Sequence, residues 1–327
     1  MQKSGFSFER ALSYPFTAPH LGSFPWLFGA AYAAALIAML AVIGLFGWRD
    51  FAAWVQAIEA LEAAGEPSPA DVIGLIFGGM SPVLTWGAVA GLGSWVIWAM
   101  FETASQRRYI FGRRFSLGFG ADELRMMVVG LLWGLMGFVI FFLPVILIFF
   151  STFGLILSAE FEADPEAAAP QIIATVFGMF GLMVLLGPLY IFFATRLAPC
   201  FGMTLKEGRI VFFDAWGASR GRFWPIFGAY VILVICAGMI SQVISGVMQV
   251  MMMPALMAIP SDAGASMEDV QAVLLSPGFL IPMGLLYFLM FFMQGLTQHV
   301  AGAPAALAAR HDPRNDMDDA ARVDSFS

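Results

Sequence analysis

The sequence has very few charged residues for its length. Of its 327 residues only 12% are charged, whereas 60% are hydrophobic. A soluble domain carries about 25% charged residues, so this chain cannot cover a soluble fold of its size with polar surface. The formal net charge of −7 identifies no partner, because the charges are strongly segregated along the chain. The shortage of charge excludes a soluble protein, and we expect no nucleic-acid partner.

Cysteine and histidine are also scarce. The two cysteines are Cys200, at an expected helix end, and Cys236, at an expected mid-membrane position, so we predict no structural disulfide. The cysteines and the three histidines lack zinc-binding spacing. The methionines around Met251 are typical of gap-filling residues rather than of a soft-metal site. We therefore predict no metal, no cofactor and no catalytic group.

Long apolar runs dominate what remains. A membrane-spanning helix needs about 20 apolar residues, and six segments reach this length. The sequence therefore predicts an all-α polytopic fold. The six predicted spans are Phe24–Gly47, Pro82–Phe101, Met126–Leu157, Ile172–Ala194, Phe223–Met253 and Pro277–Val300.

Three features set the expected limits of these spans. Ser81 followed by Pro82 is typical of a helix start, so we place the second start there. Pro144 predicts a kink in the third span. Residues 50–64 predict an amphipathic helix on the outer surface. The first span is longer than the apolar core of a signal peptide, which disfavours that alternative.

Lysine and arginine predict the topology. All of them except Arg49 fall in the termini or in loops 102–125 and 195–222, and the positive-inside rule places such loops in the cytoplasm. We therefore expect a multi-pass inner-membrane protein with both termini cytoplasmic. The alternate loops are acidic and contain Glu59, Glu62, Glu66, Glu160, Glu162, Asp164, Glu166, Asp262, Glu268 and Asp269.

A weak internal repeat suggests how the spans are grouped. Residues 24–32 resemble residues 223–230, and each copy follows a short amphipathic stretch. This pattern favours three helical hairpins, each entered from a short interfacial helix, although membrane helices in general favour such aromatic and proline starts. The expected organisation is a cytoplasmic amphipathic lead at 1–23, a six-helix transmembrane domain at 24–303, and a polar, disordered cytoplasmic tail at 304–327.

Polar side chains within the spans are the candidate functional residues. The fifth span carries the polar residues Ser241, Gln242, Ser245 and Gln249, of which Gln242, Ser245 and Gln249 share one face. In hydrocarbon such a face turns inward, either to hydrogen-bond another helix or to line a wet cavity. The sequence favours the first interpretation and leaves the second open.

Other polar residues lie near span ends. Gln294 and Gln298 are i, i+4 neighbours at the end of the sixth span, and we expect His299 to lie at the interface, within reach of water. Glu102 ends the second span, where we expect it to pair with a loop arginine or with Arg196. Residues 217–221 match G-x-S-x-G, but no strand precedes them, so we interpret Ser219 as part of a helix start rather than as a nucleophile.

A pattern of basic and aromatic residues precedes the fifth span. It comprises an arginine and a proline in Arg196–Pro199, Ala-Trp in Asp214–Trp216, and Ser-Arg-Gly before the aromatic residues in Ser219–Trp224. This pattern resembles the bacterial six-helix inner-membrane proteins that include the YciC-like and glycerophosphodiesterase-associated membrane-domain groups. The resemblance implies the fold and the location but no activity. The candidate cytoplasmic interface is Arg196, Asp214, Trp216, Arg220, Arg222 and Trp224.

These observations favour a non-enzymatic membrane protein. We expect a structural or accessory subunit in envelope or lipid homeostasis, in contact with the bilayer and with a membrane-protein partner or a second copy of itself. The alternative is a small-molecule or lipid permease that uses the polar face of the fifth span. A hydrolase built around Ser219 is a distant third interpretation.

Overall fold

The structure is a computed structural model of the chain. It describes residues 6–18, 22–63, 69–156, 165–257, 272–273 and 275–314. Within these ranges the regular structure is helical, and six helices are long and apolar enough to cross a membrane. The all-α polytopic fold predicted from the sequence is confirmed. The principal helices are α1 (Phe8–Thr17), α2 (Phe24–Ala63), α3 (Pro69–Phe111), α4 (Ala121–Gly137), η1 (Phe138–Phe142), α5 (Leu143–Ile156), α7 (Pro165–Leu197), α8 (Cys200–Glu207), α9 (Ala215–Ala218), α10 (Phe223–Met257) and α12 (Pro277–Arg310).

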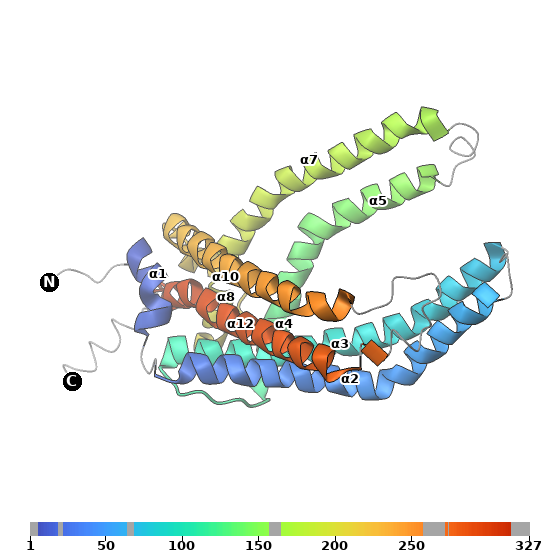
Figure 1. The fold of residues 1–327 in the computed structure, drawn as a ribbon. Helices are drawn as coiled ribbons and strands as arrows, with labels where there is room; N and C mark the ends of the chain where they lie inside the picture. Colours follow the sequence, from blue (N-terminus) through green and yellow to red (C-terminus); the bar gives the residue numbers. More distant parts are fainter. Residues whose placement is uncertain are drawn as a thin grey trace, which may run out of the picture.

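The long helices form three hairpins, as expected from the repeat. The first is α2–α3, the second is α4–η1–α5 with α7, and the third is α10–α12 (Figure 1). The first and third hairpins pack together, because α12 contacts α2, α3 and α10. The upper part of the second hairpin, formed by α5 and α7, stands away from this four-helix bundle (Figure 1). Helices α5 and α7 therefore pack mainly against each other, whereas α4 packs against α3 and α8.

Two glycines allow the first and third hairpins to approach closely. A Cβ atom on Gly295 of α12 would lie 2.8 Å from Cβ of Tyr32 in α2. A Cβ atom on Gly29 of α2 would lie 3.1 Å from the backbone oxygen of Phe292 in α12. Small residues at such crossings are the usual means of close helix packing in membranes. The crossing of α2 and α12 therefore depends on the absence of a side chain at both positions.

The predicted start of the second span at Pro82 is wrong. Helix α3 begins at Pro69 and continues through Pro82, since the apolar residues before Ser81 extend the helix and a proline removes only one backbone hydrogen bond. The expected separate helix at 50–64 is also wrong, because residues 50–63 are the end of α2. With 40 residues, α2 is about 60 Å long, about twice the thickness of a hydrocarbon core.

The predicted kink near Pro144 has a structural counterpart. Residues Phe138–Phe142 form a π-helical segment directly before α5, in which Pro144 is the second residue. A proline lacks the N–H that would bond to the carbonyl four residues earlier, and wider helical turns often accommodate such a loss. This segment lies where the second hairpin leaves the bundle (Figure 1).

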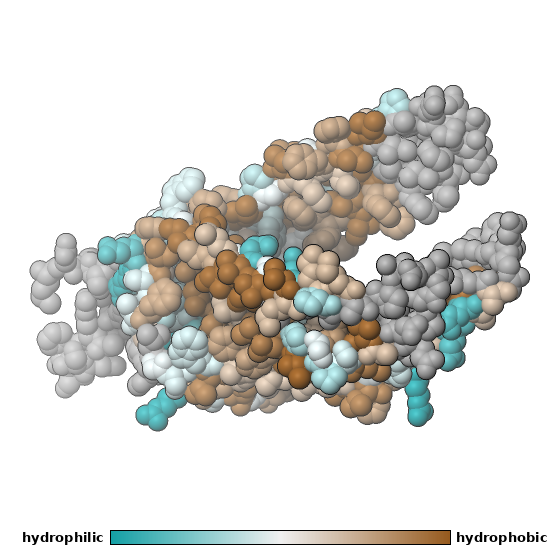
Figure 2. Space-filling model, in the orientation of Figure 1, coloured by the Kyte–Doolittle hydropathy of each residue, from teal (hydrophilic) through white to brown (hydrophobic). Residues whose placement is uncertain are grey.

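One end of the bundle carries most of the charge. This end, here called the basic end, is formed by α1, α8, α9 and the adjoining ends of α3, α4, α7, α10 and α12. Every described lysine and arginine except Arg49 lies in these segments or in the loops next to them. Figure 2 shows that hydrophobic side chains predominate over the middle of the bundle. Most acidic residues of the alternate loops lie outside the described residues, so the structure does not place them.

The predicted boundary of the C-terminal tail is wrong. Helix α12 continues to Arg310, and Ala305–Ala309 are buried against α8 and neighbouring segments. His311 and Asp312 are also buried. The alanine-rich sequence fits closely packed helices, because alanine fills little space and favours helix. The rest of the expected tail, from residue 315 onward, lies outside the described residues.

Candidate functional site

A cavity with polar walls lies between the first and third hairpins. Its volume is about 580 Å³, and its lining comes from α2, α3, α10 and α12. The walls are largely apolar, but hydroxyl and amide groups enter from three of the helices. We call this space the polar cavity. Its polar lining residues are Tyr32, Ser241, Ser245, Gln294, Thr297 and Gln298.

The polar face predicted on the fifth span reaches this cavity only in part. Ser245 lines the cavity together with Ser241, which precedes it by one helical turn. Gln242 and Gln249 instead lie on the exposed surface of α10. The face that turns inward therefore runs through Ser241 and Ser245, with small residues such as Gly238 beside them. On the sixth span, the predicted neighbours Gln294 and Gln298 both line the cavity.

A buried carboxylate lies behind one wall of the cavity. Glu102 of α3 accepts a hydrogen bond from Gln298 Nε2 at 3.2 Å and another from Gln106 Nε2 at 2.8 Å. Gln298 Nε2 also donates to the backbone oxygen of Trp98 at 3.2 Å. Within the described part of the chain Glu102 has no ion pair, so its expected pairing with a loop arginine or with Arg196 is wrong. Gln298 therefore connects the cavity to a buried acidic side chain.

The amide oxygens of both glutamines are buried acceptors without a partner in the described residues. These atoms are Oε1 of Gln298 and Oε1 of Gln106. An unsatisfied acceptor in an apolar surrounding costs about 1–3 kcal/mol. The hydrogen bond from each amide nitrogen to Glu102 fixes the orientation of the glutamine, and this orientation leaves the amide oxygen without a partner. Gln298 also lines the cavity, so its unpartnered oxygen belongs to a residue of the cavity wall.

The region between the cavity and the basic end is filled by a buried polar cluster. His299 is fully buried, so its predicted access to water is wrong. Its ring accepts a hydrogen bond from Arg108 at Nε2 and stacks on Tyr109, with ring centroids 4.8 Å apart. Ser105 Oγ lies 2.7 Å from His299 Nδ1. This cluster, comprising Ser105, Arg108, Tyr109 and His299, closes the basic end of the bundle.

The geometry of the cluster opposes nucleophilic chemistry at Ser105. Because Arg108 donates to Nε2 of His299, Nδ1 carries the ring proton and donates to Ser105 Oγ. A histidine in this tautomer cannot accept a proton from that serine. Ser105 is also fully buried. The pair is therefore a structural contact between α3 and α12.

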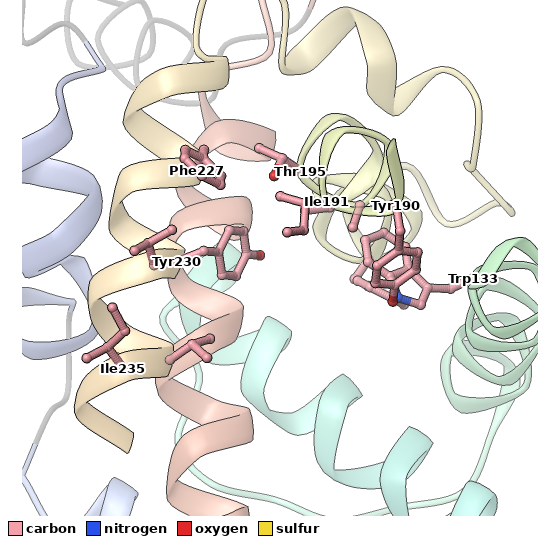
Figure 3. Close-up of a pocket in the computed structure, with 12 residues that line it drawn as sticks. Trp133, Tyr190, Ile191, Thr195, Phe227, Tyr230 and Ile235 are labelled. Carbon is pink, nitrogen blue, oxygen red and sulfur yellow. The ribbon is translucent and has the colours of Figure 1, made fainter. Parts of the chain in front are cut away.

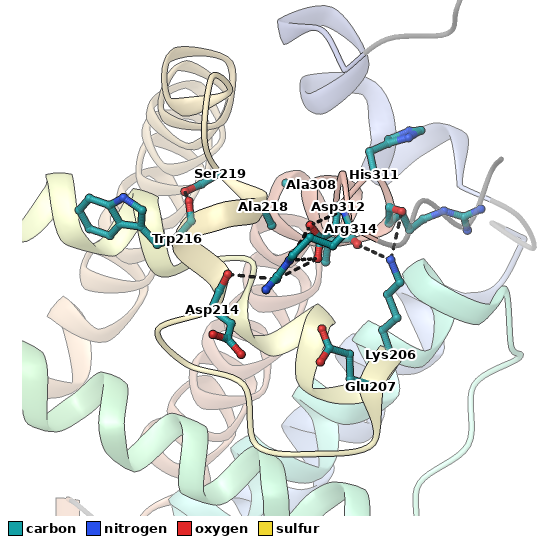
Figure 4. Close-up of polar contacts among 12 residues, drawn as sticks. Lys206, Glu207, Asp214, Trp216, Ala218, Ser219, Ala308, His311, Asp312 and Arg314 are labelled. Atoms are coloured by element: carbon teal, nitrogen blue, oxygen red, sulfur yellow. Dashed lines mark hydrogen bonds and ion pairs between the residues drawn. The ribbon is translucent and has the colours of Figure 1, made fainter. Parts of the chain in front are cut away.

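The basic end holds the residues of the predicted interface. Arg222 Nη1 donates to the backbone oxygen of His311 at 2.6 Å, which ties the start of α10 to the end of α12. Arg314 hydrogen-bonds the carboxylate of Asp312 and the backbone oxygen of Asp214 (Figure 4). The hydrogen bonds that Arg314 donates to Asp312 raise the pKa of Arg314 above its ordinary value. These bonds fix the loop before α10 against the C-terminal segment.

The remaining interface residues surround the end of α7. The guanidinium of Arg196 lies over the rings of Trp216, Phe192 and Phe223. Trp224 is exposed on the outer surface of α10. Both tryptophans fit the aromatic belt at a membrane boundary. Arg220 is exposed, and its side chain makes no hydrogen bond or ion pair with the described residues.

The G-x-S-x-G match is part of a helix end. Ser219 follows α9, is buried, and donates from its Oγ to the backbone oxygen of Trp216 at 3.0 Å (Figure 4). Gly221 adopts a φ of 73°, which allows the chain to turn into α10. The motif thus has no nucleophile-elbow geometry.

Sequence reasoning missed the importance of the end of α3. Glu102, Ser105, Gln106 and Tyr109 recur at helical spacing and so share one face. That periodicity was the available signal, although it does not show that α12 covers the face.

In comparisons with known proteins, no family model matches the chain, and neither the curated proteins nor the solved structures give a significant match.

Proposed function

We propose that this membrane protein is a permease for a small solute rich in hydrogen-bond donors, most simply a cationic one. The observation that carries the proposal is the polar cavity, into which hydroxyl and amide groups of α10 and α12 point from within an apolar bundle. Polar groups at membrane depth are costly unless they are hydrogen-bonded or face water. A volume of about 580 Å³ suits a small ligand.

The charge near the cavity supports a donor-rich solute. Gln298 presents an unpartnered acceptor, and the carboxylate of Glu102 lies directly behind it. When ionised, Glu102 would attract a cation in the cavity and repel an anion. The buried polar cluster lies between the cavity and the basic end, so transport requires this cluster to open in another conformation.

The proposal requires water in the cavity, and two neighbouring positions on α10 test this. Ala237 lines the cavity, whereas Cys236 is exposed on the outer surface of the helix. An Ala237→Cys variant in a Cys236→Ala background should react with a small charged methanethiosulfonate reagent, because water allows the thiolate to form. Ethanolamine, as a small cationic probe, should slow the reaction.

The native Cys236 is the matched control. It lies at the same depth but faces lipid under this proposal, so it should react far more slowly with the same reagent. Mass spectrometry of the intact protein measures both rates. Equal rates at the two positions, or no reaction at Ala237→Cys, would mean that the cavity is dry and would remove the basis for a permease.

An accessory subunit in envelope or lipid homeostasis is the second candidate. The observation in its favour is the hairpin of α5 and α7, whose apolar side chains such as Phe149, Phe177 and Phe180 are exposed. A membrane-protein partner or a second copy would cover this surface. Purification in mild detergent followed by mass spectrometry tests this candidate, which requires a stoichiometric partner or a dimer that Phe177→Ala or Phe180→Ala weakens. The resemblance to the YciC-like group is compatible with both candidates.

We also propose that the basic end faces the cytoplasm across a bacterial inner membrane. The support is the segregation of lysine and arginine. A Ser116→Cys variant should react with an impermeant thiol reagent only after lysis, whereas a Glu59→Cys variant should react in intact spheroplasts. Labelling of Ser116→Cys from outside would reverse this orientation.

A further inference from the structure

We infer a specific binding site for an anionic phospholipid in a groove between α7 and α10, separate from the polar cavity. Two neighbouring hollows lie along these helices. The one nearer the basic end has a volume of about 720 Å³ and is bordered by Arg196, Gly221 and Trp224. The other has a volume of about 400 Å³, and the two share Ile191 and Phe227 in their walls.

The head of the groove has the chemistry that recognises a phosphate. Arg196 donates from Nη1 to the backbone oxygen of Ser219 at 3.2 Å. Its Nε is a buried donor without a partner in the described residues, and no carboxylate there pairs with its charge. Three aromatic rings hold the guanidinium in place. Arginine favours phosphate because its planar group donates two parallel hydrogen bonds.

The position of Arg196 relative to aromatic residues matches a lipid headgroup. Trp216 lies beneath its guanidinium, and Trp224 borders the same hollow and is among the most exposed side chains of α10. Tryptophan gathers at the level of the headgroups in membrane proteins. An uncompensated arginine at this level lies where the phosphate of a bilayer lipid is found.

The deeper part of the groove suits an acyl chain. Figure 3 shows Trp133 and Tyr190 on one side and Phe227, Tyr230 and Ile235 on the other. The lining is almost wholly apolar, and Thr195 and the two tyrosines contribute its few polar groups. The groove lies at the base of the wedge where α5 and α7 part from α10 (Figure 1). A lipid can therefore enter sideways from the bilayer without leaving the membrane.

The groove differs from the polar cavity in chemistry, and of its two main helices only α10 also lines the cavity. Only Val234 lines both spaces. The inference therefore does not rest on the permease proposal, and either can fail without the other. A lipid in this site would bridge the second hairpin to the bundle, since α7 and α10 contribute its opposite walls.

Native mass spectrometry with phosphatidylglycerol tests the site. The wild-type protein should retain one phosphatidylglycerol at collision energies that remove phosphatidylcholine. Arg196→Gln should weaken this binding by about tenfold, the effect of losing charge-assisted hydrogen bonds. Arg114→Gln is the matched control, because Arg114 is exposed on the loop after α3, away from the groove. It should leave the binding of that lipid unchanged.

A second variant and a second ligand separate the site from general surface charge. Ile235→Trp fills the chain-binding part without touching the charge and should also weaken retention. Inorganic phosphate at millimolar concentration should not displace the lipid, because it lacks the chain. Equal losses in Arg196→Gln and Arg114→Gln, unchanged binding in Ile235→Trp, or equal retention of phosphatidylcholine would each overturn the inference.

Discussion

The basic end and the hairpin of α5 and α7 differ in the side chains that they bury and expose. At the basic end the interior contains a histidine, an arginine and a glutamate that are at most 5% exposed, each hydrogen-bonded to a neighbouring helix. In the hairpin the side chains that face outward are apolar, such as Phe177 at 70% exposure. In a membrane no hydrophobic driving force brings apolar surfaces together, so close packing and hydrogen bonds between helices hold a bundle together. The basic end has such hydrogen bonds, whereas the exposed apolar residues of the hairpin mainly set its place in the bilayer.

The largest effect should follow from breaking the buried polar cluster. His299→Leu removes the acceptor of Arg108 and the partner of Ser105 within a closed interior. We expect a loss of about 3–5 kcal/mol in the free energy of unfolding, the usual result of removing one partner of a buried charged group. Denaturant titration in detergent measures it. Phe180→Leu in α7, an apolar exchange on an exposed surface, should change it by less than about 0.5 kcal/mol. Equal effects would contradict the contrast between the two regions.

A second effect should come from the ion pair at the start of α4. Arg107 Nη1 lies 2.7 Å from Glu123 Oε1, and the Glu123 side chain is only 2% exposed. Arg107→Met should cost about 2 kcal/mol, less than a fully buried pair because the Arg107 side chain is 17% exposed. Arg125→Met breaks a more exposed pair with Asp122 and should cost about 0.5 kcal/mol or less. A similar cost for both would show that burial does not decide these contributions.

A smaller effect is expected at the wall of the polar cavity. Gln298→Leu removes the hydrogen bonds to Glu102 and to the Trp98 backbone. Hydrogen bonds between membrane helices average about 0.6 kcal/mol and reach about 1.7 kcal/mol, so we expect a loss of about 1 kcal/mol. The same variant should abolish the protection of Ala237→Cys by ethanolamine. Retained protection would remove Gln298 from the proposed solute site.

The smallest effect should be that of Gln242→Leu. If Gln242 joined α10 to another helix, its loss would cost about 0.6 kcal/mol. The structure places this side chain on the exposed surface of α10, so the thermal melting temperature should remain unchanged or rise slightly. Ser245→Leu, on the cavity side one turn away, should block the labelling of Ala237→Cys instead. A clear loss of stability in Gln242→Leu would show that its face is covered.

Particular residues show how much of the structure could be predicted from the sequence. The starts at Phe24, Phe223 and Pro277 were predicted correctly, because an abrupt change from polar to apolar composition marks them. The start of α3 was predicted too late, at Pro82. A proline is a local signal for a helix start, but the apolar residues before it extend this helix back to Pro69. The two cysteines are free, as expected. For Gln242, Ser245 and Gln249, helical spacing identified a polar face but not which part of it turns inward.

The sequence by itself determined the number of spans, their alternating direction and the concentration of basic residues at one end. These follow from hydropathy and charge, which act residue by residue and need no knowledge of neighbours. Only the tertiary structure decided that His299 is buried, that Glu102 bonds to two glutamines, and that Arg196 lies over three rings. Those facts depend on which helices meet, because a polar side chain at a helix end faces water or a partner according to what packs over it.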